Sequence, residues 1–128
     1  MGMFHYYDLP GAEIFVFDDF LICQIGEGME IHPEHNTNLK EVIEKHFLGK
    51  HIGYISNRVN SYSVDPLTYV ETEKIPNLLA MAIIPETEIM RKNAEYERNF
   101  YDKPYEIFDC LGDAINWIHC LIREKTNS

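Results

Sequence analysis

Apolar and polar residues alternate in short blocks along the chain, and the period of each block predicts an element. Residues 14–17 and 20–25 are β-type apolar runs separated only by Asp18 and Asp19. Two such runs joined by a short polar turn are typical of a β-hairpin. We therefore expect the chain to open with an antiparallel pair of strands.

The middle of the chain switches to helical spacing and back again. Pro33 suits the first turn of a helix, where its missing N–H would have no partner anyway, and Gly49 suits the end of that helix. Asp65 and Pro66 form an N-cap followed by a first helical residue. The elements expected here are a helix from Pro33 to about Phe47, a strand over 51–56 and a short helix from Asp65 to about Lys74.

The C-terminal half continues the alternation. Residues 78–84 are apolar at consecutive positions, which favours a strand covered on both faces, and Pro85 ends it. A helix over 87–100, a strand over 105–108 and a strongly periodic final helix follow, with Trp117 at the border of its apolar stripe. The order ββαβαβαβα predicts an α/β fold in a single domain over 1–128, with a mostly parallel five-stranded sheet and an antiparallel N-terminal strand.

Charge and hydropathy exclude several partner classes. The 128 residues include 21 acidic and 11 basic side chains, a net charge of −10, which disfavours binding to nucleic acid and to anionic membrane surfaces. The longest apolar run, 78–84, is far shorter than the roughly 20 residues of a membrane span, so we expect no membrane insertion. No signal-peptide pattern precedes the first strand, and we expect a cytoplasmic protein.

The three cysteines indicate thiols rather than disulfides. Cys23, Cys110 and Cys120 are widely spaced and form no CxxC pair, which fits reduced cysteines in the cytoplasm. Cys23 and Cys120 stand within strong apolar patterns, so both are expected in the core.

No residue pattern predicts a catalytic or metal centre. His32 and His35 stand three apart in "HPEH", but zinc needs three or four ligands and no third is matched to them. No GxSxG motif occurs, and the Gly26-Glu27-Gly28 stretch lacks the rest of a dinucleotide loop. We therefore expect no metal, no cofactor and no enzymatic activity. An enzyme using Asn57, Arg58 and Asp65 is the weaker alternative.

One polar stretch is the best candidate for a functional surface. The segment "YISNRVNSYSVDP", residues 54–66, leads from a predicted strand into a helix start. Loops that leave the carboxyl ends of parallel strands commonly carry the binding groups of α/β folds. The expected interaction loop comprises Asn57, Arg58, Asn60, Tyr62 and Asp65.

The element order and the ending "PYEIFDCLGDAINWI", residues 104–118, resemble the STAS or SpoIIAA-like family of anti-sigma-factor antagonists, particularly its small bacterial members. In that family a serine at a helix start after the third strand is phosphorylated. The resemblance places Ser63 at this phosphoacceptor position, preceded by Tyr62 where the family has Asp. The alternative from the residues themselves is that Ser61 and Ser63 cap turns and pair loop backbone groups.

Two functions are consistent with these observations. The first is a non-enzymatic STAS-like domain, with a regulatory role implied by the family, that binds another protein through residues 57–74; homodimerisation is compatible with it. The second is a carrier of a small apolar ligand or lipid, which the likeness of some SpoIIAA-like proteins to the SEC14 fold implies.

Overall fold

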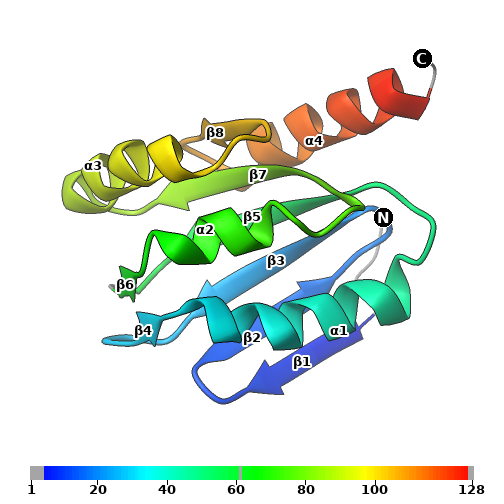
Figure 1. Cartoon of the computed structure of the whole chain (residues 1–128). Helices are drawn as coiled ribbons and strands as arrows, with labels where there is room; N and C mark the ends of the chain where they lie inside the picture. Colours follow the sequence, from blue (N-terminus) through cyan, green and yellow to red (C-terminus); the bar gives the residue numbers. More distant parts are fainter. Residues whose placement is uncertain (1–4, 61, 127–128) are drawn as a thin grey trace.

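The computed structural model describes residues 5–60 and 62–126, and a six-stranded sheet forms its centre (Figure 1). The strand order is β1-β2-β3-β5-β7-β8, and two further short strands, β4 and β6, pair with each other. The bounds are β1 His5–Leu9, β2 Ala12–Val16, β3 Phe20–Ile25, β4 Glu30–Ile31, β5 Ile52–Arg58, β6 Ser63–Val64, β7 Leu78–Pro85 and β8 Tyr105–Ile107.

The sheet is antiparallel at its N-terminal edge and parallel elsewhere. β1, β2 and β3 form a meander, whereas β3, β5, β7 and β8 run parallel. The predicted hairpin turn at Asp18 and Asp19 is confirmed, with the Phe17 N–H donating to the Phe20 carbonyl at 3.0 Å. The predicted α/β fold class is therefore confirmed.

The expected number of strands was wrong by one in the main sheet. β1, "HYYDL", has no apolar run because it is an edge strand with mostly exposed side chains. The sequence did not predict β4 and β6 either, because a two-residue strand is too short to show a periodic pattern.

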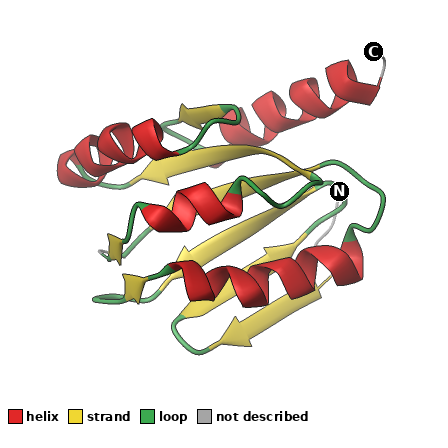
Figure 2. Ribbon diagram, in the orientation of Figure 1, coloured by secondary structure: helices red, strands yellow, loops and turns green. Residues whose placement is uncertain are grey.

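The helices cover both faces of the sheet (Figure 2). α1, α2 and α3 pack on one face, and α4 packs on the other against β3, β5 and β7. Two short 3-10 helices adjoin α1 and α3. The bounds are η1 Pro33–His35, α1 Asn36–His46, α2 Leu67–Thr72, α3 Glu88–Glu97, η2 Arg98–Phe100 and α4 Leu111–Thr126.

The face under α4 is closely packed. Ala114 and Ile118 of α4 are fully buried against Phe20, Ile55 and Ala82 of the sheet. Close approach is possible at Gly53, where an added methyl group would lie 2.5 Å from Cγ2 of Ile118.

The apolar stripe of α4 predicts the positions of Trp117 and Cys120. Trp117 is half-buried, with its ring 5.5 Å from that of Phe108, as expected for a residue at the border of the stripe. The prediction that Cys120 is in the core was wrong, because Cys120 is exposed on the outer side of the helix. Helical periodicity is coarse, and a small residue beside the stripe can fall on either side of its edge.

Candidate functional site

A cavity of about 90 Å³ lies between the sheet and the layer formed by α1 and α2. Its floor is a row of side chains at matched register positions on four adjacent strands, with Ile14 opposite Cys23, Cys23 opposite Ser56, and Ser56 opposite Ile83. The walls include Ile25, Leu39, Tyr54, Tyr62, Val64 and Met81. The cavity is thus mainly apolar, with a few hydroxyl groups.

A buried polar seam joins α1 to α2 above the cavity. The Asn36 side-chain amide donates to the Thr68 carbonyl at 3.1 Å, and the Thr72 hydroxyl donates to the Asn36 side-chain oxygen at 2.8 Å. The Thr68 hydroxyl also bonds the Ile31 carbonyl at 3.3 Å. All three side chains line the cavity, and each has a partner, so the seam holds the helices together without leaving an unpaired polar group.

A buried ion pair lies behind one wall of the cavity. Nη2 of Arg58 is 2.5 Å from Oε1 of Glu97 and donates to Oη of Tyr69 at 2.8 Å, and Tyr69 in turn donates to Glu97. Burial lowers the pKa of Arg58, but Tyr69, Tyr62 and Glu97 outweigh that effect and the net direction is upward. The guanidinium is therefore permanently charged, and its charge is balanced by the Glu97 carboxylate.

Tyr62 links this ion pair to the cavity floor. Its ring lies under the Arg58 guanidinium, 5.2 Å from ring centroid to Cζ, and its hydroxyl is 3.0 Å from Oγ of Ser56. Burial raises the pKa of Tyr62, although Arg58 and Ser56 oppose the shift. The groups that reach the cavity here are neutral hydroxyls rather than charges.

Cys23 is the only cysteine at the cavity among the described residues, and it is poorly suited to nucleophilic chemistry. Burial raises the pKa of its thiol to about 11, a shift that its hydrogen bond with Tyr54 only partly opposes. A reactive cysteine needs the thiolate at neutral pH. Cys23 therefore acts as a small apolar floor residue, and its predicted burial is confirmed.

The predicted interaction loop is folded inward more than expected. Asn57 and Arg58 belong to β5, which extends two residues beyond the predicted strand, and the side chain of Arg58 is only 5% exposed. Asn60 donates to the Ile25 carbonyl at 3.1 Å, and Ser61 lies outside the described residues. The alternation of Tyr54, Ser56 and Arg58 on one face of an extended strand is the sequence signal that could have revealed this.

After Asn60 the chain forms β6, which pairs in parallel with β4. The Ser63 N–H donates to the Met29 carbonyl at 2.9 Å, and the Asp65 N–H donates to the Ile31 carbonyl at 2.8 Å. The Asp65 carboxylate accepts from the Leu67 N–H at 3.1 Å. The predicted helix start was one residue early, because the N-cap is Pro66 and α2 begins at Leu67.

Ser63 is exposed, opposite Glu30 in the β4–β6 register. Asp65 follows two residues later, and the nearby cation Arg58 is paired with Glu97. Phosphorylation of Ser63 stays a prediction.

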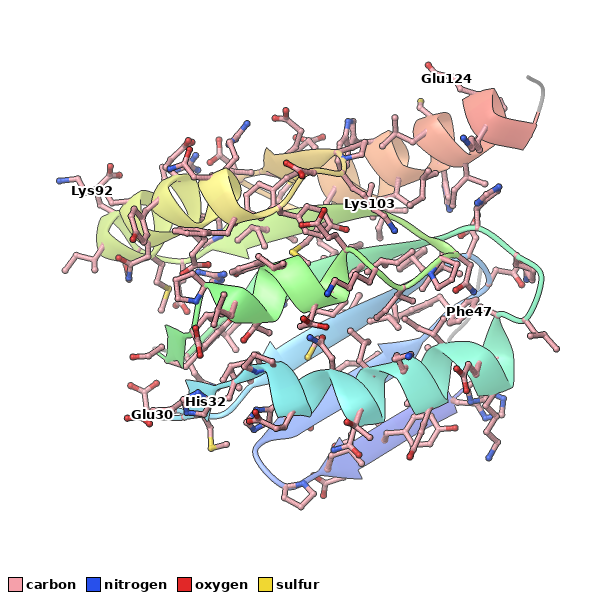
Figure 3. The ribbon with its side chains drawn as sticks, viewed as in Figure 1. Glu30, His32, Phe47, Lys92, Lys103 and Glu124 are labelled. Carbon is pink, nitrogen blue, oxygen red and sulfur yellow. The ribbon has the colours of Figure 1, made fainter. Side chains whose placement is uncertain are left out.

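The two histidines of "HPEH" lie at the same end of the molecule. Nε2 of His32 lies 3.6 Å from the Glu30 carboxylate and its Nδ1 lies 3.6 Å from the Asp65 carboxylate. Nδ1 of His35 accepts from the His32 N–H at 3.0 Å. Figure 3 shows Glu30 and His32 side by side, at the far end of α1 from Phe47. Across the described ranges no group of three or more His, Cys, Asp or Glu side chains could hold a metal ion.

Large apolar side chains are exposed at the carboxyl edge of the parallel strands. Val59 follows β5 and is 44% exposed, Leu67 begins α2 and is 61% exposed, and Ile89 near the start of α3 is 73% exposed. Arg58 and Pro85 end β5 and β7 as register partners, so the segments that follow leave the sheet at the same edge.

This arrangement of strands and helices is that of the SpoIIAA-like fold. A similar solved structure is the crystal structure of an uncharacterised protein of the DUF3478 family, with a SpoIIAA-like fold, from Shewanella loihica PV-4. The TM-score is 0.54 and the identity 15%, over 88% of this chain and 97% of that chain. Neither a family model nor a curated protein matches the sequence.

At 15% identity this likeness shows the fold alone. In the part of the chain that the structure describes, none of the helices is both long and apolar enough to traverse a bilayer.

Proposed function

We propose that this protein is a non-enzymatic SpoIIAA-like domain that binds a small, mostly apolar molecule in the cavity beneath α1 and α2. The cavity itself supports this proposal: a concave apolar space with a few placed polar groups is the usual form of a ligand site. It replaces an exposed loop as the leading candidate because Arg58 and Tyr62 contribute to the interior.

The size of the cavity restricts the cargo. Drug-sized ligands occupy roughly 300–1,000 Å³, and an engineered cavity of about 150 Å³ holds benzene. A space of about 90 Å³ fits a smaller molecule unless α1 and α2 separate. A long-chain lipid would require the Asn36 seam to open, so we propose a small compound as the cargo.

Native mass spectrometry tests the proposal on protein purified from its own host without denaturation. The expected result is a defined adduct that is lost on denaturation and absent from Ala12→Leu, which fills the cavity from β2. Asn116→Leu, on the exposed side of α4, is the control and should keep the adduct. A wild-type protein that carries no adduct and takes up no added small molecule would overturn the proposal.

A second candidate function is binding of another protein through the outer side of residues 57–74. The exposed side chains of Val59 and Leu67 support it, since apolar residues grouped on a surface are common at interfaces. Ser63 lies on the same outer side of the segment and is the proposed site of regulation by phosphorylation. A second copy of the chain is one partner that this surface would accept.

Quantitative pull-down with Leu67→Asp and Ser63→Asp tests this candidate. Leu48→Asp is the matched control, because Leu48 is 83% exposed at the opposite end of α1. Loss of one specific partner in the two outer-surface variants, but not in Leu48→Asp, is expected. Equal recovery of every partner by all variants would exclude this surface as an interface.

A further inference from the structure

The polar groups of the cavity differ in how completely they are hydrogen-bonded. Asn36, Thr68 and Thr72 have partners across the helix seam, and Tyr69 donates to Glu97. The hydroxyl hydrogens of Thr68, Thr72 and Tyr69 are thereby engaged within the protein, as is one of the two amide hydrogens of Asn36.

Ser56 and Tyr62 differ from these groups because their two hydroxyls pair with each other. Their hydroxyl oxygens are 3.0 Å apart, and a pair of hydroxyls can share one hydrogen bond in either direction. Whichever residue donates, the O–H of the other has no acceptor among the described residues. Ser56 is 3% exposed, so bulk water does not satisfy this donor directly.

Arg58, which lies beside the Ser56–Tyr62 pair, adds a hydrogen-bond donor but no unpaired charge. Nε of Arg58 is buried without a hydrogen-bond partner in the described part of the chain, and the guanidinium lies against the Tyr62 ring. Because Glu97 neutralises Arg58, the described residues in contact with Ser56 and Tyr62 include no uncompensated cation with which to hold a carboxylate. A buried anion would therefore be costly here.

We infer that the cavity selects small uncharged molecules that carry a hydrogen-bond-accepting oxygen, with a ketone, ester or amide carbonyl as the chemical class. The free hydroxyl of the Ser56–Tyr62 pair donates to this oxygen, while Ile14, Ile25 and Ile83 contact the hydrocarbon part. This inference rests on the proposed ligand-binding function.

The test compares three probes matched in size: 2-butanone, its alkene counterpart 2-methyl-1-butene, and propionate. Binding is measured by titration of protein labelled at the isoleucine δ1 methyl groups. We expect 2-butanone to bind about tenfold more tightly than the alkene, as one hydrogen bond to a buried donor implies, and more tightly than propionate.

Hydroxyl deletions sharpen the test. Tyr62→Phe leaves the Ser56 O–H free, and Ser56→Ala leaves the Tyr62 O–H free, so each single variant should keep the ketone preference. The double variant should bind ketone and alkene equally, with an unchanged circular dichroism spectrum as the folding control.

The outcomes separate the two proposals. Equal binding of ketone and alkene by the wild type would overturn this inference and leave the ligand-binding function standing. Tightest binding of propionate would also overturn it, in favour of an anion site. No methyl shift with any probe would contradict the ligand-binding function itself.

Discussion

The two faces of the sheet use the same strands to build different interiors. Under α4, Phe20, Ile55 and Ala82 pack against Ile118 with no space for an added methyl group at Gly53. Under α1 and α2, the alternate residues of the same strands surround a cavity and include hydroxyls, a thiol and a buried ion pair.

Function accounts for this difference better than stability does. A closely packed apolar layer stabilises a small domain most efficiently, whereas cavities and buried ionic groups generally weaken it. The α4 face therefore mainly stabilises the fold, and the α1–α2 face forms the proposed ligand site. Comparable substitutions on the two faces of the sheet test this division of roles.

The largest expected effect comes from the ion pair of the cavity face. Glu97→Ala leaves Arg58 buried without its carboxylate and should lower the free energy of unfolding by about 3–5 kcal/mol. The matched control on the same helix is Glu95→Ala, which removes an exposed 3.6 Å pair with Arg98 and should cost about 0–1 kcal/mol. Urea denaturation measures both. Equal losses of unfolding free energy in the two variants would show that the buried ion pair contributes no more to stability than the exposed one.

Cysteine alkylation compares the inside of the cavity with the outside of α4. Because burial raises the pKa of Cys23 to about 11, its thiolate fraction at pH 8 is roughly 100-fold below that of an ordinary thiol. Intact-mass analysis should show rapid modification of exposed Cys110 and Cys120 and slow modification of Cys23, which accelerates as pH rises towards 11. Equal rates for all three at pH 8 would contradict the buried position of Cys23.

Added volume should have opposite consequences on the two faces. Gly53→Ala forces a methyl group against Ile118 and should cost about 1–3 kcal/mol of unfolding free energy. Ala12→Leu places its extra carbons in the cavity and should cost less than about 1 kcal/mol. Thermal unfolding of the two variants gives the comparison. A larger loss in Ala12→Leu would mean that the space is not available to a side chain.

Sequence patterns predicted the regular elements well, because 78–84 and the stripe of α4 are long and strongly periodic. They failed where structure depends on distant contacts. The edge strand β1 is defined by its pairing with β2, and β6 by its pairing with β4.

The site was predicted only in part, for the same reason. Residues 54–66 do contribute to it, but the burial of Arg58 depends on Glu97, 39 residues away. The cavity itself had no local signal. Ile14, Cys23, Ser56 and Ile83 become neighbours only through the register of four strands.

The central claim is that the face beneath α1 and α2 admits a small molecule and the face beneath α4 does not. Titration of isoleucine-methyl-labelled protein with 2-butanone tests it most directly. We expect saturable shifts of the methyl signals of Ile14, Ile25 and Ile83, which line the cavity, and no shift of those of Ile55 and Ile118. Shifts confined to Ile55 and Ile118, or no saturable shift at any of the five methyl groups, would contradict it.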